Sequence, residues 1–284
     1  DELKFGGLVV TDALDMAGVA KGFGVGDAAV RALEAGADVL LMPSDPGAAI
    51  RAVVDAVRSK RLTEARIDES AGRLLAAKQR LGLDRTRLTD VEALADVLDE
   101  PEAAERAQQI ADRAVTLVRN RDSLLPLRSD ENACFVALTE NRYTTQGDAL
   151  AEGIRRRTGR EPAMLDPLMT EAELDRAVAA AVECPKIVVA AFASVSVYRS
   201  GMALPGGFAK LIDAVVASGK PVALVALGNP YLIRAFPAVA AYMTTYSPVV
   251  PSEIAAVKAL FGEIPASGRL PVTIPGIAER GGGK

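Results

Sequence analysis

The apolar positions in the first part of the chain form two short continuous runs with a helical pattern between them. The runs are "LVVTD" at residues 8–12 and "ADVLLMPSD" at residues 37–45, and neither alternates apolar with polar positions. Between them, "VGDAAVRALEAG" at residues 25–36 repeats its apolar positions at helical spacing and stops at Gly36. Strands that are apolar on both faces and joined by a helix are typical of a parallel sheet covered by helices.

Two helices are predicted next, at residues 45–60 and 63–83, because apolar positions recur at helical spacing and the last turns carry Lys and Arg. No third strand pattern follows them. Two strands would leave open sheet edges with unpaired backbone groups. We therefore expect residues before Asp1 to complete this sheet, and we expect no self-contained barrel within residues 1–86.

A charged stretch from about residue 85 to 113 predicts a surface helix that connects two domains. A second domain begins near residue 115. Its strand patterns alternate with helical patterns, which predicts a layered α/β sandwich with a mostly parallel sheet. The predicted strands are residues 134–140, 187–193, 221–230 and 238–247, and the predicted helices are residues 147–159, 171–183 and 207–219.

Composition narrows the classes of function. The 284 residues are 50% hydrophobic and carry a formal net charge of -4, so there is no basic excess to bind nucleic acid. No apolar run is long enough to span a membrane. Cys134 and Cys184 each precede an apolar run, which we interpret as two small buried residues rather than a disulfide framework. The cysteines leave the redox compartment, and therefore the localisation, open.

The chain contains no histidine and no tryptophan. Histidine metal sites and Ser-His-Asp or Cys-His catalysis are therefore excluded within these residues. Any general acid or base must be a carboxylate, a lysine, a tyrosine or a cysteine. Asp12 stands out because it ends an apolar strand, where it either caps the following turn or carries out chemistry.

Five segments in order carry a family resemblance. They are "FGGLVVTDALDMAGV", "GDAAVRALEAGADVLLMP", "RIDESAGRLLAAKQRLGL", "AVTLVRNRDSLLPL" and "AAVKALFGEIPASGRLPVTIPG". Together they resemble the C-terminal portion of a glycoside hydrolase family 3 enzyme, and "TDALDM" is most similar to the β-N-acetylhexosaminidase branch. The resemblance implies an α/β chain with the last two βα units of a (β/α)8 barrel at residues 1–86. A helical linker at 87–114 and a three-layer α/β/α sandwich domain at 115–284 would follow.

The resemblance also implies a retaining, exo-acting glycosidase that releases terminal β-linked N-acetylglucosamine, with Asp12 as the nucleophile. Barrel residues at the carboxyl ends of strands carry catalysis, and Asp12 is at such a position. The implied partners are a small carbohydrate substrate and the missing N-terminal barrel segment of the same protein, and this chemistry needs no metal or organic cofactor. The acid/base residue of this branch is a histidine upstream of the nucleophile, so this chain alone is expected to be incomplete.

Further candidate substrate-binding residues lie in the loops that follow predicted strands. Asp15 and Met16 lie in the loop after the first strand and are candidate substrate contacts, although a loop aspartate also bonds backbone and a methionine also simply packs. In the loop at residues 194–207, Tyr198 and Arg199 are candidate contacts at the wall of the cleft. Met42 is a weaker candidate at the end of the second run.

Other polar motifs have structural interpretations. Ser44 and Asp45 precede Pro46, which favours a helix N-cap. "GFGVG" at residues 22–26 lies too far from the preceding strand for a phosphate cradle, so we interpret it as a flexible loop. The arginines at residues 155–157 are expected to complement a helix dipole.

The sequence is also compatible with three other interpretations of the catalytic residues and of the function. Glu140 ends a predicted strand and is a candidate acid/base, as in the β-glucosidase branch, although a loop glutamate is more often solvated. The same fold acting on β-glucosides or β-xylosides, or using phosphate in place of water, is a second interpretation. A non-catalytic carbohydrate-binding relative is a third.

Overall fold

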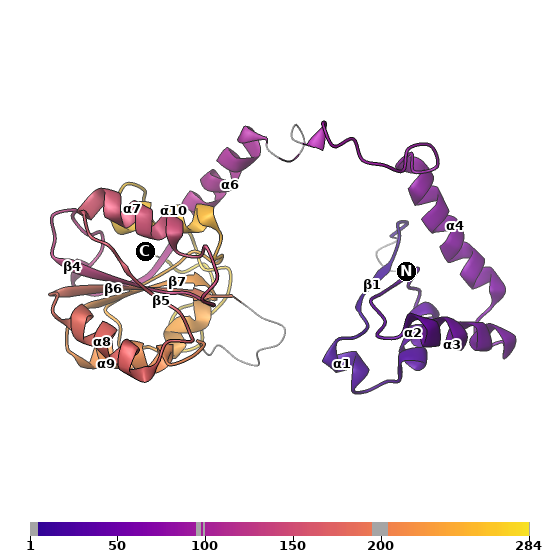
Figure 1. Cartoon of the computed structure of the whole chain (residues 1–284), viewed down its shortest axis with the longest axis horizontal. Helices are drawn as coiled ribbons and strands as arrows, with labels where there is room; N and C mark the ends of the chain where they lie inside the picture. Colours follow the sequence, from indigo (N-terminus) through magenta and orange to yellow (C-terminus); the bar gives the residue numbers. More distant parts are fainter. Residues whose placement is uncertain (1–4, 95–97, 99, 195–203, 284) are drawn as a thin grey trace. The chain divides into compact units, whose positions relative to one another are not determined.

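The chain divides into two compact units, residues 1–95 and 96–284. In a computed structural model, residues 5–94, 98, 100–194 and 204–283 are described (Figure 1). Separate hydrophobic clusters stabilise the two units.

The first unit contains a two-stranded parallel sheet and its helices. β1 (Val10–Ala13) pairs with β2 (Val39–Leu41). The helices are α1 (Ala17–Ala20), α2 (Val25–Glu34), α3 (Pro46–Arg58) and α4 (Glu64–Arg80). The predicted strand-helix-strand order is confirmed, and α1 is a short addition to it. Within residues 5–94 there is no closed barrel.

The strands of the first unit are only partly covered. Its small core contains Val30, Leu33, Ala56 and Leu62, which come from the helices and the turn after α3. By contrast, Val10 is 50% exposed, although it comes from one of the most apolar runs in the sequence. Within the described residues, nothing covers the strands as fully as their sequence predicts.

The second unit is built on a six-stranded sheet with the order β3-β8-β7-β6-β4-β5. Only β3 runs antiparallel to its neighbour β8, and the other pairs are parallel. The strands are β3 (Thr116–Asn120), β4 (Ala133–Leu138), β5 (Ala163–Leu165), β6 (Lys186–Ala193), β7 (Val222–Gly228) and β8 (Ala241–Thr244). The mostly parallel sheet predicted from the sequence is confirmed.

Helices cover both faces of this sheet, so the second unit has three layers (Figure 1). On one face lie α6 (Pro101–Ala114), α7 (Asp148–Thr158) and α10 (Val250–Leu260), and on the other lie α8 (Glu171–Val182) and α9 (Phe208–Ala217). Alternate residues of each strand enter the two cores. In β7, for example, Leu224 and Ala226 face α8 and α9, whereas Val225 and Leu227 face the other layer.

Three details differ from the sequence predictions. The sequence patterns do not predict β3 and β5, which are the two edge strands of the sheet, and β5 is only 3 residues long. The helix predicted over residues 85–113 is wrong at its start, since α6 begins at Pro101, a residue favoured at the first helical position. Two short 3-10 helices, η1 (Arg121–Ser123) and η2 (Pro230–Arg234), complete the unit.

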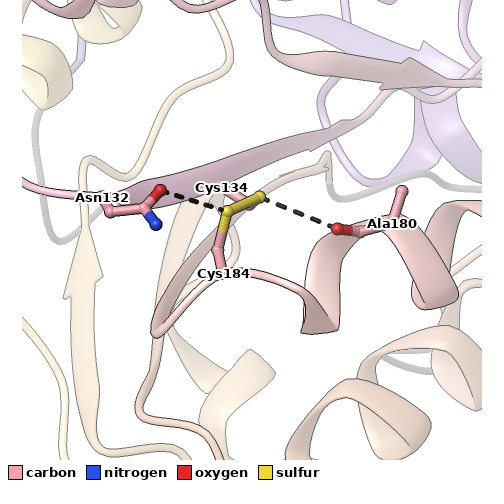
Figure 2. Close-up of a disulfide and its surroundings, with 4 residues drawn as sticks. All are labelled: Asn132, Cys134, Ala180 and Cys184. Atoms are coloured by element: carbon pink, nitrogen blue, oxygen red, sulfur yellow. Dashed lines mark hydrogen bonds between the residues drawn. A yellow bond between two sulfur atoms is a disulfide. The ribbon is translucent and has the colours of Figure 1, made fainter.

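The interpretation of the two cysteines is also wrong, because Cys134 and Cys184 form a disulfide (Figure 2). Cys134 is in β4, and Cys184 is in the turn between α8 and β6. The 50 residues between them hide their proximity in the sequence. Parallel pairing of β4 with β6 brings the two segments together, and a Cα–Cα distance of 5.6 Å suits the bridge.

Among the described helices, none has both the length and the apolar character needed to cross a membrane.

Candidate active site

Asp12 lies near the carboxyl end of β1, where the strand is irregular. Val10 pairs with Val39 and Ala13 with Leu41, so β1 advances three residues while β2 advances two. Such a bulge changes the direction in which a side chain points. The Thr11 hydroxyl accepts a hydrogen bond from the Leu41 N–H at 3.0 Å and so links the two strands across the irregular step.

The Asp12 carboxylate is exposed. Its Oδ1 accepts a hydrogen bond from the N–H of Ala13 at 2.7 Å, which limits the orientation of the side chain. A carboxylate held by its neighbouring amide and open to solvent can act as a nucleophile or as a base.

The other candidates of the first unit lie close to Asp12 in the chain. Asp15 is exposed, and Met16 is half-buried at the start of α1. Met42 follows β2 with a φ of 45° and is 59% exposed. A positive φ is uncommon for a methionine and often occurs at functional sites. Because β1 and β2 are parallel, Asp12 and Met42 belong to the same carboxyl edge of the small sheet.

Ser44 and Asp45 have the local role that their sequence indicates. The Asp45 Oδ1 accepts the N–H of Ala48 at 2.9 Å, and Pro46 occupies the first helical position of α3. The N-cap interpretation is therefore confirmed. The glycine motif is a loop only in part: Gly24 caps α2, while Gly26 lies inside that helix, where an added Cβ would be 2.6 Å from the Ala52 Cβ. Gly26 thus permits close packing of α2 on α3.

Asp38 lies at the opposite, amino-terminal end of β2, and its side chain is fully buried. It accepts hydrogen bonds from the Val9 N–H at 3.0 Å, from the Ser70 hydroxyl at 2.8 Å and from the Arg73 guanidinium at 3.2 Å. Arg66 lies 3.5 Å away. The Val9 amide, with Ser70 and Arg73, lowers the pKa of Asp38 to about 2 despite its burial. Sequence analysis did not select Asp38, and its contacts indicate a structural clamp between the strands and α4.

In the second unit, Glu140 follows β4 and is bonded on several sides. Its Oε1 accepts the Ser194 N–H at 2.8 Å, and its Oε2 accepts the Ser194 hydroxyl at 2.6 Å and the Gln146 amide at 2.8 Å. Ser194 directly follows β6, the neighbour of β4 in the sheet. These contacts favour a role for Glu140 in holding two strand ends together over a role as a proton donor.

Glu253 is a buried carboxylate that sequence analysis missed. It lies in the first turn of α10, is 1% exposed, and accepts the N–H groups of Gly147 and Leu150 at 3.1 and 3.0 Å. It therefore occupies the amino-terminal end of α7, where the helix dipole favours an anion. Burial raises the pKa of Glu253, and the nearby Asp148 carboxylate acts in the same direction. The only sequence signal is a glutamate in a mostly apolar helix.

Two candidates cannot be placed, because Tyr198 and Arg199 lie outside the described residues. The described segment ends at Ser194, whose N–H donates a hydrogen bond to Glu140. Among the described residues, no group of three or more acidic or cysteine side chains could hold a metal ion. The arrangement that the structure brings together is therefore the carboxyl edge of β1 and β2.

An exposed carboxylate at the end of a parallel strand, followed by a three-layer α/β sandwich, defines an α/β protein with the features of a catalytic βα unit. Comparison with known families is more specific. Residues 1–77 match the model of the glycosyl hydrolase family 3 N-terminal domain, and residues 115–281 match that of the C-terminal domain. The chain belongs to glycosyl hydrolase family 3.

Several relatives have names that specify a sugar. The chain is 26% identical over 311 residues to Beta-hexosaminidase A of Pseudoalteromonas piscicida, covering 96% of this chain and 50% of the relative. It is 33% identical over 127 residues to a Beta-N-acetylglucosaminidase/beta-glucosidase of Cellulomonas fimi, covering 45% of this chain and 22% of the relative.

Among solved structures, a family 3 beta-N-acetylglucosaminidase from Paenibacillus sp. str. FPU-7 is similar with a TM-score of 0.74 and 28% identity. The match covers 96% of this chain and 52% of that structure. The chain thus spans about half the length of this structure and of the Pseudoalteromonas relative, and less of the Cellulomonas relative.

Proposed function

We propose that the protein containing this chain is a retaining, exo-acting glycosidase that releases terminal β-linked N-acetylglucosamine, with Asp12 as its nucleophile. The exposed position of Asp12 at the bulge of β1, within the segment that matches the family's N-terminal domain, carries this proposal. The name of the Paenibacillus relative favours N-acetylglucosamine as the sugar, and the name of the Pseudoalteromonas relative, a hexosaminidase, is compatible with it.

In the proposed reaction, a carboxylate oxygen of Asp12 attacks the anomeric carbon, and the bond from that carbon to the leaving oxygen breaks. In the β-N-acetylhexosaminidase branch that the chain resembles, the leaving oxygen takes its proton from a histidine, and since this chain has no histidine, we place that acid outside it. Water then attacks the same carbon, so two displacements retain the configuration. The Ala13 amide orients Asp12, while Asp15, Met16, Tyr198 and Arg199 remain proposed substrate contacts.

We further propose that residues 1–86, with β1 and β2, form the last two βα units of a larger (β/α)8 barrel, and that residues 87–114 join them to the sandwich domain. The exposed apolar side chains of the strands support this, since Val9, Val10 and Leu41 are 40 to 50% exposed in a two-stranded sheet. The match to relatives about twice as long also supports it. The missing barrel segment would cover these side chains and supply the acid.

The first test is covalent trapping on the full-length protein. A ring-fluorinated N-acetylglucosaminyl fluoride should form a stable ester with the nucleophile, and peptide mass spectrometry then locates it. We expect the adduct on Asp12. Hydrolysis by Asp12→Asn should fall at least about a thousand-fold, or about 4 kcal/mol. The matched variant Asp15→Asn, which alters another exposed carboxylate of the same loop, should keep most of kcat and change mainly KM.

The second candidate function is β-glucoside hydrolysis, which the double name of the Cellulomonas relative favours. Labelling of Asp12 by a fluoro-glucosyl reagent, without labelling by the N-acetylglucosaminyl reagent, would establish this alternative. A folded protein that binds sugar but is labelled by neither reagent would instead be a non-catalytic relative. A phosphate requirement for turnover would identify a phosphorylase.

A further inference from the structure

The disulfide lies at the amino-terminal ends of β4 and β6, away from the strand ends that Glu140 joins (Figure 2). Other contacts hold the same segments together. Cys134 pairs with Ile187 in the parallel ladder, and Lys186 forms an ion pair with Glu131 at 2.5 Å. Because the sheet already fixes both segments, the disulfide can open without separating the strands.

The two sulfurs differ in their access to solvent. Cys184 is 6% exposed, whereas Cys134 is half-buried and lines a cavity of about 180 Å³ between β4, β5 and α8. The cavity walls include small residues, among them Ala163, Ala177 and Ala180. Cys184 is not one of the residues that line this cavity. A small nucleophile that enters it therefore meets Cys134 first.

The lining of the cavity includes one positively charged side chain, that of Arg160. Arg160 and Glu161 both line the cavity, and Glu161 pairs with Arg155 at 3.3 Å. Arg160 has no ion pair among the described residues. A guanidinium in the cavity wall attracts a thiolate that carries further negative charges more than a thiolate whose charge is balanced by an ammonium group.

Each sulfur also has an oxygen nearby. The Asn132 Oδ1 is 3.7 Å from the Cys184 Sγ, and the Ala180 carbonyl is 3.8 Å from the Cys134 Sγ (Figure 2). Bonded sulfurs have no proton to donate, so these are sulfur–oxygen contacts in the oxidised form. After the bond breaks, each thiol has an acceptor in place. The site thus accommodates both the disulfide and the dithiol.

We propose that Cys134–Cys184 is an exchange-competent disulfide and that low-molecular-weight anionic thiols attack it at Cys134. The thiolate forms a new bond to the Cys134 Sγ, the bond between the two cysteines breaks, and its electron pair leaves on the Cys184 Sγ, which takes a proton from water. A second thiolate then attacks the sulfur of the bound small thiol, the bond from that sulfur to the Cys134 Sγ breaks, and Cys134 leaves as a thiolate that takes a proton from water, which releases the oxidised dimer of the small thiol. The protein disulfide is reduced, and two thiols are oxidised.

The test treats the native full chain with glutathione, quenches with acid, blocks thiols with N-ethylmaleimide, and maps peptides without reductant. Glutathione should appear on the Cys134 peptide at least about ten times as often as on the Cys184 peptide, which should carry the maleimide. A majority of adducts on Cys184 would overturn the proposal. So would maleimide on both cysteines before any thiol is added, or exchange only in denaturant.

A matched variant tests the role of the charge. Arg160→Gln should slow exchange with glutathione about threefold and leave exchange with cysteamine nearly unchanged, since the attacking thiolate of glutathione carries net negative charge and that of cysteamine, with its ammonium group, carries none. Equal effects on the two thiols would contradict the role of Arg160. The wild-type mapping does not depend on this variant, so a folding defect in Arg160→Gln would leave the first test intact.

Discussion

The two units of this chain contain strands of similar apolar character with very different burial. In β1, Val10 is 50% exposed, whereas Val225 in β7 is completely buried between two helical layers. A continuous apolar run predicts how a strand is covered in its finished sheet. The second unit contains the helices that bury both faces of its strands, whereas the described part of the first unit leaves apolar side chains of its strands exposed.

A buried carboxylate in each unit extends the comparison. Asp38 accepts one backbone amide and is held between two arginines, so its pKa falls to about 2. Glu253 accepts backbone amides but lies near another carboxylate, and burial raises its pKa. The same chemical group therefore responds to pH in opposite directions in the two units, because only one has compensating cations.

The largest expected effect is a loss of stability when a carboxylate is placed in β7, compared with a small loss when it is placed in β1. Val225→Asp places a carboxylate in a fully buried position and should cost on the order of 5 kcal/mol, which unfolds the second unit. Val10→Asp in the half-exposed β1 should cost less than about 1 kcal/mol in the 284-residue chain. Hydrogen exchange of peptides from each unit measures both effects. If Val10→Asp cost as much stability as Val225→Asp, the proposed difference in strand burial between the two units would be wrong.

The next effect is acid sensitivity of the first unit. The pKa of Asp38 is lower folded than unfolded, so its contribution of about 2 kcal/mol is present above pH 4 and lost as pH falls toward 2. The pKa of Glu253 is higher folded than unfolded, so its contribution is present below about pH 4.5 and lost as pH rises through the folded pKa. Acidification should therefore destabilise the first unit before the second.

Urea unfolding at several pH values, followed in each unit by limited proteolysis, measures this order. Asp38→Asn should abolish the acid-induced loss in the first unit, and Glu253→Gln should flatten the pH dependence of the second. If the second unit lost stability first on acidification, the opposite signs assigned to the two carboxylates would be wrong.

The smallest expected effect concerns a feature that the units share. Asp45 caps α3, and Thr170 caps α8 in a reciprocal capping box with Glu173. Asp45→Ala and Thr170→Ala should each cost about 1 kcal/mol, measured by urea unfolding, because each removes one cap of an exposed helix start. Ser44→Ala, next to the first cap, serves as a control with little effect. Unequal costs would show that the units differ in local capping as well as in strand burial.

Local patterns were sufficient for much of the fold. The apolar run before Glu140 predicted β4, and the Ser44–Asp45–Pro46 sequence predicted the start of α3, because both signals act over a few residues. The start of α6 was predicted too early, since charged residues before Pro101 are compatible with either helix or turn. For the candidate site, the end of an apolar strand identified Asp12, and its bulge with Thr11 required the paired strand.

The sequence by itself determined the order of elements, the family resemblance and the position of Asp12 at a strand end. Only the tertiary structure decided which distant residues meet: Asp38 with Arg66 and Arg73, Glu140 with Ser194, and Cys134 with Cys184. These pairs are 28 to 54 residues apart. Local propensities act within a turn of helix or a short strand, whereas such contacts depend on strand pairing and helix packing across the whole unit.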